Sequence, residues 1–398
     1  MISNQETENR KPKTILVTGG AGYIGSFTVR ELLDHKYDVV VLDSLENGHK
    51  EAVDPRAKLE VADLSDSNAT AKVFDKYDIS AVIDFAAYLA VGESMENPKK
   101  YIKNNVENFV KLLDVMAGKG CNYIIKSSTA STYGNPENDS DFPLKEDYQE
   151  NYKPDKSALL TGKWDNQDVE GEEFFQKIIG YCEEVFVNKP NLQLTSEDLT
   201  KLRIPTSIYG LTKSLDEIIL GKYNKSSNIK HVSLRYFNVC GAAVDGSIGE
   251  DKPDPTTLMT VCFWSILGRF PKLKLNGNDY PTKDGTCIRD YIHPLDLATG
   301  HLAALKYLLE GNQSEVINLG TGKPYSVFEV IYTVEKASDK KVEYEIGPRR
   351  SGDPVMSYAN PTKAIKLLGW KAKYNLKDMA NTAWKWHRSH PSGYSKNG

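Results

Sequence analysis

Two side chains four residues apart could carry acid–base chemistry on an alcohol. Tyr209 and Lys213, in the run Tyr-Gly-Leu-Thr-Lys, begin an apolar-periodic stretch, and this spacing places both on one face of a helix. A phenol has a pKa of about 10 and is a poor base at neutral pH, but a neighbouring ammonium favours the phenolate. Taken alone, this pattern is typical of a surface helix pair, so it needs support from other motifs.

A run of hydroxyl side chains follows an apolar strand. The run Ser127-Ser128-Thr129-Ala130-Ser131-Thr132-Tyr133-Gly134 begins where a strand expected from Tyr123 to Ser127 ends. Ligands of open α/β sheets bind at the carboxyl ends of the strands, so these hydroxyls are placed to orient a reacting alcohol. A lone run of this kind is usually a turn, and its coincidence with the tyrosine–lysine pair makes it informative.

A glycine-rich turn predicts a dinucleotide site. The run Thr18-Gly19-Gly20-Ala21-Gly22-Tyr23-Ile24-Gly25 follows the first strand and opens the first helix. Its glycines permit a tight turn, backbone approach to a pyrophosphate and close packing of helix on strand, and the helix N-terminus attracts phosphate. Asp43 closes the second strand about 20 residues on, where a carboxylate takes a ribose 2′-hydroxyl and repels a 2′-phosphate. The sequence therefore favours NAD over NADP.

These motifs lie on alternating strands and helices. A helix is expected from Tyr23 to Asp34, and further strands at Thr14 to Thr18, Asp38 to Asp43, Ala81 to Ala86, His231 to Phe237 and Val316 to Leu319. Near-continuous apolar runs joined by helices indicate strands buried on both faces, as in the parallel sheet of an α/β fold. Asp63 follows a further strand candidate, where it could contact an adenine, although alone it is more typical of a solvated loop.

Composition argues against several classes of protein. The 398-residue chain is 40% hydrophobic and 26% charged with a net charge of −4, so it offers no overall basic field for nucleic acid. Residues 1–12 read as a disordered leader without an apolar signal core, and the most apolar helical stretch, residues 258–267, is far shorter than the roughly 20 residues that span a bilayer. The five scattered cysteines form no C-x-x-C pair, which indicates a reducing compartment. We expect a cytoplasmic protein with no membrane partner, no nucleic-acid partner and no bound metal.

Residues 152–203 interrupt the α/β pattern with a charged, turn-rich segment. Within it, one amphipathic helix is expected because apolar side chains recur at helical spacing, at Phe174, Phe175, Ile178, Ile179, Cys182, Val185 and Phe186. The simplest interpretation is a surface insertion that buries its own small apolar face. The alternative is a lid or a contact between subunits.

Further motifs extend over most of the remaining chain. They are Val91-Gly-Glu-Ser94, Asn104-Asn105-Val106, Leu234-Arg-Tyr-Phe-Asn238, Gly249-Glu-Asp251, the segment from Gly277 to His293, Asn318-Leu-Gly-Thr-Gly322, Pro348-Arg-Arg-Ser-Gly-Asp353 and Trp384-Lys-Trp-His387. With them, residues 13–394 apart from the insertion resemble the UDP-glucose 4-epimerases of the extended short-chain dehydrogenases/reductases. The C-terminal motifs carry this resemblance, because general Rossmann oxidoreductases share only the N-terminal ones.

The resemblance implies a fold and an activity. The fold is α/β: a Rossmann-type doubly wound parallel sheet over residues 13–238, including the insertion, and a smaller C-terminal α/β substrate-binding domain over residues 239–398, with segments such as Val316 to Leu319 crossing back. The activity is inversion at C4 of a UDP-hexose, UDP-galactose to UDP-glucose, through two opposite hydride transfers and a 4-keto intermediate, with NAD retained. Relatives are commonly homodimers through helices of the Rossmann domain.

The resemblance also implies residue roles. Tyr209 is expected to be the base and acid, Lys213 its electrostatic partner, and Thr129 the hydroxyl that binds the sugar. Cofactor contacts are expected at Gly19, Gly22, Tyr23, Ile24, Gly25, Asp43, Asp63, Leu64, Phe85, Ala86, Asn105, Ser127, Tyr209, Lys213 and Phe237. Substrate contacts are expected at Thr129, Asn238, Thr257, Leu258, Arg289, Tyr291, Ile317, Arg350 and Asp353. Two arginines suit a diphosphate because guanidinium forks match phosphate oxygens; His293 is expected to be structural, with no metal.

Three features depart from the family pattern: the insertion at residues 152–203, Leu89, and the pair Thr256 and Thr257. Leu89 stands where the family often has a lysine, so one contact to the cofactor phosphates is missing. Thr256 and Thr257 replace a common asparagine pair. Ile317 is matched to the residue that sets the size of the sugar pocket, and its intermediate size suggests partial activity on UDP-N-acetylglucosamine, unless it is simply a core residue.

Other activities remain open at this point. A 4,6-dehydratase would need an Asp-Glu pair directly after the strand-end threonine, where this chain has Ala130 and Ser131. An epimerase for UDP-N-acetylhexosamines or UDP-uronates, or a decarboxylase, differs in only a few contacts. A non-catalytic protein that binds NAD or nucleotide-sugars is disfavoured by the intact Thr129, Tyr209 and Lys213.

Overall fold

The computed structural model describes residues 13–136, 138–148, 161–165, 167–202, 205–252, 255–350 and 353–394. The leader expected at residues 1–12 and the first part of the insertion, up to residue 160, lie outside the described residues. None of the helices in these ranges has the length and apolar character that a bilayer-spanning segment requires.

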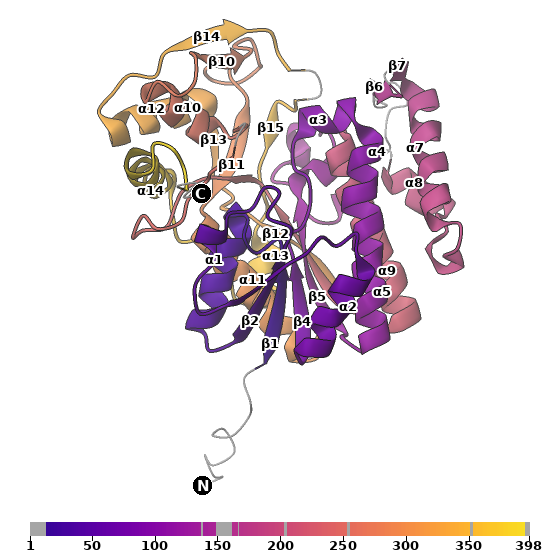
Figure 1. The fold of residues 1–398 in the computed structure, drawn as a ribbon. Coiled ribbons are helices and arrows are strands. Elements are labelled where there is room, and N and C mark those ends of the chain that lie inside the picture. The colour runs from indigo at the N-terminus through magenta and orange to yellow at the C-terminus, as the bar shows by residue number, and fades with distance from the viewer. Residues whose placement is uncertain are drawn as a thin grey trace.

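A seven-stranded parallel sheet forms the centre of the described chain (Figure 1). Its strands are β1 (Thr14–Thr18), β2 (Asp38–Asp43), β3 (Lys58–Val61), β4 (Ile79–Asp84), β5 (Tyr123–Thr129), β8 (Lys230–Tyr236) and β12 (Glu315–Leu319). The spatial order is β12-β8-β5-β4-β1-β2-β3, so the direction of winding reverses between β1 and β4. This is the expected doubly wound α/β sheet, and ligands of such sheets bind at the carboxyl ends of the strands beside the reversal.

Helices cover both faces of this sheet because the strands are apolar on both sides. One face carries α2 (Ser67–Lys76), α5 (Asn108–Lys119) and α9 (Ile208–Ser227), which pack on strand residues such as Leu16 and Ile124. The other carries α1 (Tyr23–Asp34), α11 (Pro294–Leu309) and α13 (Thr362–Leu368), which pack on the alternate residues, such as Ile15 and Ile125. Alternation along each strand thus divides the core into two layers.

A second, smaller region lies beside the carboxyl ends of the large sheet. Its helices are α10 (Leu258–Ile266), α12 (Val327–Ser338) and α14 (Leu376–Ser389), which share one apolar core. Its short strands are β9 (Asn238–Val239), β10 (Leu273–Asn276), β11 (Ile288–Ile292), β13 (Pro324–Ser326), β14 (Tyr344–Gly347) and β15 (Met356–Ser357). β11 pairs with β9, β13 and β15, which brings segments distant in sequence onto one small sheet.

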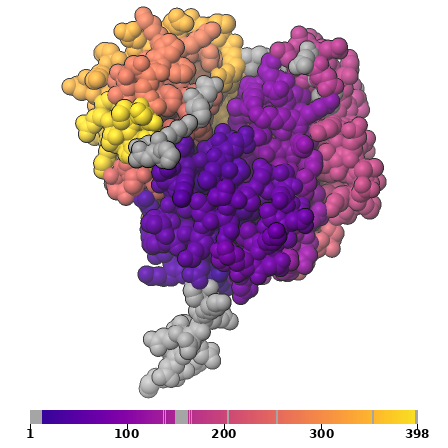
Figure 2. Space-filling model, viewed as in Figure 1, coloured from indigo at the N-terminus to yellow at the C-terminus, as the bar shows by residue number. Residues whose placement is uncertain are grey.

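The described part of the insertion packs on the outside of the sheet's α5 and α9 layer. It contains β6 (Thr161–Trp164), β7 (Gln167–Glu170), α7 (Gly171–Phe186), the 3₁₀ turn η6 (Pro190–Leu192) and α8 (Ser196–Leu202). The expected apolar helix is α7, but it does not bury a small face of its own. Its buried side chains join the core shared by α2, α5 and α9. Figure 2 shows the insertion, in pink, across the molecule from the orange and yellow C-terminal region.

Short connecting elements lie near the carboxyl edge of the large sheet. They are α3 (Val91–Glu96), α4 (Pro98–Tyr101) and the π-helical turn η2 (Ile102–Glu107), which continues into α5, together with the 3₁₀ turns η1 (Lys50–Ala52), η3 (Ala130–Tyr133) and η4 (Asp139–Asp141). β6 of the insertion contacts α3 and α4, and Lys99 of α4 forms an ion pair with Asp165 beside β6 at 2.7 Å. The insertion therefore supports the elements that border this edge.

Candidate active site

The glycine turn between β1 and α1 cannot accept larger side chains. Gly19 has a φ of +68°, and a Cβ there would lie 2.8 Å from the backbone nitrogen of Ala86. A Cβ on Gly25 would lie 2.3 Å from the carbonyl oxygen of Gly19, which the first turn of α1 contacts closely. The turn thus leaves the N-terminus of α1 open, where backbone N–H groups and the helix dipole favour a phosphate.

A cavity of about 410 Å³ opens at this turn, along the carboxyl ends of the strands. Eleven of the side chains or glycines expected to contact the cofactor line it: Gly19, Gly22, Tyr23, Ile24, Gly25, Asp43, Asp63, Leu64, Phe85, Ala86 and Ser127. The Asp43 carboxylate accepts hydrogen bonds from Ala21 N and Leu45 N, each at 2.9 Å, so it is fixed in the cavity wall. Burial raises the pKa of Asp43, and these hydrogen bonds oppose the shift.

These features fit NAD. An elongated site with a glycine turn at one part of its wall accepts a pyrophosphate, and a fixed carboxylate beside it accepts ribose hydroxyls while repelling a 2′-phosphate. The sequence prediction of a dinucleotide site rests on these same groups, and the structure brings them together.

Part of the cavity wall was not predicted from the sequence. It comes from the segment between β4 and α5: Tyr88, Ala90, Glu93, Lys100, Tyr101, Asn104 and Asn108 line the cavity. Leu89 lines it too, and its side chain is 45% exposed. The ammonium of Lys100 lies 2.5 Å from Glu93 Oε1 and 4.5 Å from the ring centroid of Tyr88. A cation is therefore present in this wall, although position 89 lacks one.

Four expected cofactor contacts do not line the cavity: Tyr209 and Lys213 lie next to it, and Asn105 and Phe237 lie elsewhere. Asn105 is fully buried and turns away from the cavity, where its Nδ2 donates to Thr212 Oγ1 at 3.2 Å and to Tyr88 O at 3.1 Å. It ties the cavity wall to α9, and its neighbour Asn104 lines the cavity instead. Phe237 packs in a small cluster with Tyr133, and the preceding Tyr236 lines the cavity. In both cases one of two adjacent residues lines the cavity and the other does not. The sequence pattern did not define which of the two side chains points into it.

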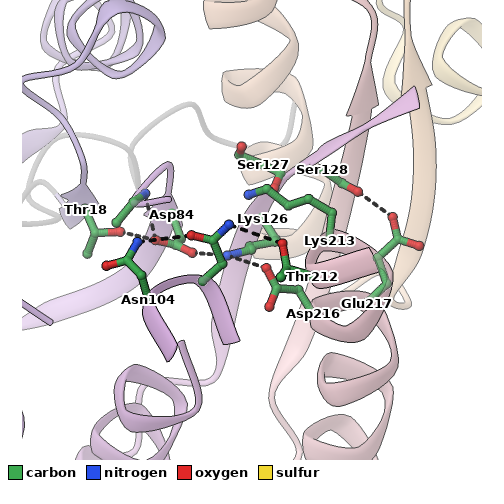
Figure 3. Close-up of polar contacts among 12 residues, drawn as sticks. Thr18, Asp84, Asn104, Lys126, Ser127, Ser128, Thr212, Lys213, Asp216 and Glu217 are labelled. Atoms are coloured by element: carbon green, nitrogen blue, oxygen red, sulfur yellow. Dashed lines mark hydrogen bonds and ion pairs between the residues drawn. The ribbon is translucent and has the colours of Figure 1, made fainter. Parts of the chain in front are cut away.

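The expected catalytic residues meet just behind the inner end of the cavity. α9 begins after Ser207, whose hydroxyl accepts from Gly210 N at 3.0 Å, and this cap places Tyr209 and Lys213 on the first turns. Lys213 Nζ donates to Ser127 O at 2.9 Å (Figure 3), and Tyr236 OH donates to Ser127 Oγ at 2.6 Å. Because Ser127 and Tyr236 line the cavity, the pair lies directly next to the space for a cofactor.

Burial dominates the acid–base properties of this group. It raises the pKa of Tyr209 to about 12, while hydrogen bonding to Thr129 and the charge of Lys126 act in the lowering direction. The pKa of Lys213 is lowered to about 8 by its burial and by Lys126. The sequence pattern predicts the stabilising charge at Lys213. The structure adds Lys126, a fully buried lysine on β5 that no motif indicated.

The small sheet around β11 assembles several expected substrate residues. Register places Asn238 of β9 opposite Tyr291 of β11, and Arg289 opposite Ser357 of β15. Arg289 Nη2 lies 3.7 Å from Asp353 Oδ1, and Asn238 Nδ2 donates to Asp290 O at 3.1 Å. Arg350, which is exposed, follows β14, and its carbonyl oxygen accepts a hydrogen bond from Asp353 N at 3.3 Å. Two arginines, an amide and a carboxylate are thus close to one another beside the large sheet's carboxyl edge.

The remaining substrate expectations have different outcomes. Thr257 and Leu258 form the N-terminus of α10, and the Thr257 hydroxyl donates to Glu250, so it is already engaged. Ile317 lies in the middle of β12 and is fully buried in the core shared with α11. That environment does not support a role in lining the sugar pocket, because the side chain faces the packed helix layer. Of the two interpretations given for Ile317, the structure favours the core residue.

His293 has a structural role. Its Nδ1 accepts from Leu295 N at 3.1 Å, which caps α11, and its Nε2 lies 3.0 Å from Thr382 Oγ1. In the described ranges no three His, Cys, Asp or Glu side chains group in a way that could hold a metal ion.

Comparison with known proteins identifies the family of this chain. Residues 15–159 match the NAD dependent epimerase/dehydratase family, and residues 184–383 match the model described as GDP-mannose 4,6 dehydratase. The UDP-glucose 4-epimerase of Lactobacillus helveticus is 39% identical over 381 residues, covering 96% of this chain and 98% of that protein. The chain belongs to the UDP-glucose 4-epimerase family.

Solved structures of the family share the fold. The UDP-glucose 4-epimerase of Bifidobacterium longum, in complex with NAD⁺ and UDP, superposes with a TM-score of 0.77 at 33% identity, covering 96% of this chain and all of that one. The UDP-Glc/GlcNAc 4-epimerase of Campylobacter jejuni gives 0.70 at 33% identity, covering 95% and 99%.

Proposed function

We propose that this chain inverts C4 of a UDP-hexose, converting UDP-galactose to UDP-glucose, with NAD held in the cavity throughout. One observation carries the proposal: Tyr209, Lys213 and the strand-end Thr129 lie directly behind the wall of a cavity that fits NAD, where Lys213 donates to the wall residue Ser127. Membership of the UDP-glucose 4-epimerase family over nearly the whole chain supports the same activity.

Tyr209 carries the proton in this proposal. Its phenolate takes the proton of the C4 hydroxyl when the sugar is oxidised and returns it when the sugar is reduced on the other face. Thr129 hydrogen-bonds the reacting oxygen and, with Lys126, lowers the pKa of Tyr209 against the effect of burial. Bound NAD supplies the acceptor and donor for the C4 hydride. Lys213, held by Ser127 O, keeps a positive charge beside the phenolate.

The diphosphate is held apart from the reacting carbon. Arg289, Arg350 and Asn238 belong to the β9–β11–β15 side of the site, and guanidinium groups bind phosphate oxygens with two parallel hydrogen bonds. Anchoring at the diphosphate leaves the hexose free to turn over, which a 4-keto intermediate must do before it receives hydride on its opposite face.

The test is an assay of the purified chain with UDP-galactose, with products followed by NMR. We expect UDP-glucose to form without added NAD, because the cofactor is retained through each cycle. Formation only after NAD is added would keep the activity and indicate weak retention at the Leu89 wall. No product in either assay would overturn the proposal and favour the non-catalytic binding protein.

Activity on N-acetylated sugars is the second candidate. Its support is the similarity to the UDP-Glc/GlcNAc 4-epimerase of Campylobacter jejuni. Ile317, which is fully buried, adds no support. Partial turnover of UDP-N-acetylglucosamine in the same assay would establish it, and good turnover of UDP-galactose alone would reject it. A dehydratase is disfavoured, although the C-terminal half matches a dehydratase model, because Ala130 and Ser131 follow Thr129.

Assembly and location complete the proposal. We propose a homodimer in the cytoplasm, supported by the family resemblance and, for the location, by five free cysteines, four of them buried. Because α8 and η6 contact α9, a dimer interface made by the outer helices of the Rossmann domain would have to include the insertion. Light scattering after size-exclusion chromatography tests the dimer, and a mass of one 44.5 kDa chain would reject it.

A further inference from the structure

Four fully buried charged side chains lie together behind the active site. Asp84 ends β4, Lys126 lies opposite it on β5, and Lys213 and Asp216 lie one turn apart on α9. We call them the buried charge cluster. With two carboxylates and two ammonium groups, the cluster is neutral when all four are ionised, which is the condition under which charges are tolerated in a protein interior.

Lys126 is the centre of the cluster. Its Nζ lies 2.5 Å from Asp84 Oδ2 and 3.0 Å from Asp216 Oδ2 (Figure 3), and 3.7 Å from the ring centroid of Phe109. Asp84 is fixed further by hydrogen bonds from Thr18 Oγ1 and from Ala86 N, the latter at 3.2 Å. The lysine is therefore held from the strand side and from the helix side at once.

The cluster is adjacent to the catalytic groups in both the chain and the fold. Lys126 precedes Ser127, whose carbonyl oxygen accepts the hydrogen bond from Lys213, and Asp216 follows Lys213 by one helical turn. The Lys126 charge acts in the lowering direction on the pKa of Tyr209 and of Lys213. The Asp216 charge acts in the raising direction on both.

A purely structural role explains this arrangement poorly. Burying an ion pair costs desolvation energy on both partners, and well-packed apolar side chains of similar volume are often as stable or more stable. The cluster nevertheless occupies the strand ends nearest the reacting groups, where a charge has the largest effect on chemistry.

We propose that Lys126 is a positioning residue of the active site, which acts with its counter-ions Asp84 and Asp216 to set the electric field in which Tyr209 takes and returns its proton. This inference rests on the proposed function. Lys126 favours the phenolate form of Tyr209, and Asp216 opposes it. Together they set the balance between the phenolate, which acts as the base, and the phenol, which acts as the acid.

Other groups act on Tyr209 or on its neighbour Lys213 and have to be considered in any pH profile. From the elements packed around it, the charged or titratable side chains are Tyr101 on α4, Asp84 on β4, Lys126 on β5, Tyr236 on β8, and Lys213, Asp216 and Glu217 on α9. Glu217 is neutralised by Arg235, whose Nη2 lies 2.5 Å from Glu217 Oε2. Among these, Lys126 and Asp216 are the two whose charges act on the pKa of Tyr209 in opposite directions, so their substitution should shift that pKa in opposite directions.

The test compares pH profiles of kcat/KM for two charge-removing variants. Lys126→Met should raise the pKa of Tyr209 and shift the ascending limb to higher pH by about one unit, and Asp216→Asn should shift it to lower pH by a similar amount. In the double variant Lys126→Met/Asp216→Asn the two effects oppose each other, so the limb should return close to that of the unsubstituted chain. A role in folding alone would lower activity without these opposite shifts.

A second readout separates this inference from the proposed function. Ultraviolet difference titration of the NAD-free chain, with the Tyr209→Phe variant as background, reports the phenolate of Tyr209 directly. We expect the order Asp216→Asn, unsubstituted chain, Lys126→Met from lowest to highest pKa. Shifts in the same direction, or none in folded variants, would overturn the role of Lys126. Absence of epimerase activity in the unsubstituted chain would instead overturn the proposed function and leave this titration as the test. If Lys126→Met fails to fold, the pKa of Tyr209 in the double variant is compared with that in Asp216→Asn.

Discussion

At the scale of single residues, Tyr209 has to ionise inside a packed protein. Burial raises its pKa to about 12, so the unassisted phenol would be almost entirely protonated at neutral pH. Thr129 and Lys126 act against burial in the structure, and a cationic cofactor ring beside the phenol would add to them. In the proposed mechanism, Tyr209 is therefore a competent base only in its assembled surroundings.

Replacing Tyr209 tests this directly. Tyr209→Phe removes the proton carrier but keeps the aromatic ring, so turnover of UDP-galactose should fall by about 10³-fold, within the range typical of general acid–base groups. Affinity for UDP should be unchanged, because the diphosphate residues lie on the other side of the site. Single-turnover kinetics and calorimetric titration with UDP measure the two effects, and a variant that keeps substantial turnover would remove Tyr209 from the mechanism.

Leu89 is the second residue that makes a testable difference. It lines the cavity in a wall where a lysine would place a charge against the cofactor phosphates. Leu89→Lys should tighten NAD binding by about fivefold, which corresponds to an interaction of about 1 kcal/mol at a partly exposed site. NAD content after purification and the Kd of the NAD-free chain give the measurement.

Leu89→Met is the matched control for that substitution. Methionine is unbranched like lysine but carries no charge. The Kd of Leu89→Met for NAD should therefore equal that of the unsubstituted chain. The gain in Leu89→Lys should shrink as salt is added, because exposed charges are screened. Equal effects of the two substitutions would show that packing, not charge, controls retention.

At the scale of elements, local patterns predicted the N-terminal half well. β1, α1 and β2 begin and end where the apolar runs and the glycine turn placed them, because strand burial, helix periodicity and glycine geometry are all encoded within a few residues. The Tyr209 helix was predicted for the same reason.

Contacts between distant segments could not be predicted in that way. Arg289 and Asp353 are brought together by the pairing of β11 with β15, and only the family resemblance indicated them. Asn105 and Ile317 were assigned to the site but face the interior, since the direction of a side chain depends on which helix packs over it. Lys126 was missed because a lysine inside an apolar strand has no recognisable motif until Asp84 and Asp216 are placed beside it.

The insertion is an element whose role in stability can be measured. Ile178 of α7 is fully buried in the main core, so Ile178→Ala should lower the free energy of unfolding of the whole chain by about 2–5 kcal/mol. Urea unfolding followed by circular dichroism should show one transition displaced to lower denaturant. Val187, which is 74% exposed beside the same helix, provides the control, and Val187→Ala should change stability by less than about 0.5 kcal/mol.

A separate transition would give the opposite conclusion. If Ile178→Ala weakened an early, small transition and left the main one in place, the insertion would fold as an independent unit. That result would restore the interpretation of a surface segment with its own small core, which the shared packing of α7 with α5 and α9 contradicts.

At the scale of the whole molecule, buried histidines couple stability to pH. Burial lowers the pKa of His231, His293, His301 and His387 to about 4 in each case. In the unfolded chain a histidine has a pKa of about 6.5, so between these two values the unfolded state binds protons that the folded state does not. Stability is therefore complete above about pH 6.5 and is lost as the pH falls toward 4, by about 2 kcal/mol for each such histidine at pH 5.

Not every buried titratable group lowers the stability of the folded chain as the pH falls. Burial raises the pKa of Asp216 to about 6, and a carboxyl group with a raised pKa in the folded state favours folding as the pH falls. The net pH dependence of the chain mixes both signs, so the contribution of one histidine has to be isolated by substitution.

His301 on α11 is suited to that substitution, because its ring packs 4.6 Å from the ring of Phe85 and its Nδ1 lies 2.8 Å from Leu297 O. In His301→Leu the difference between the unfolding free energies at pH 7 and pH 5 should shrink by about 2 kcal/mol, since the group that titrates on unfolding is gone. Leu297→Met perturbs the same helix without removing a titrating group, so it should change stability equally at both pH values. An unchanged difference in His301→Leu would mean that His301 is already protonated in the folded chain at pH 5, which its burial against Tyr236 of β8 opposes.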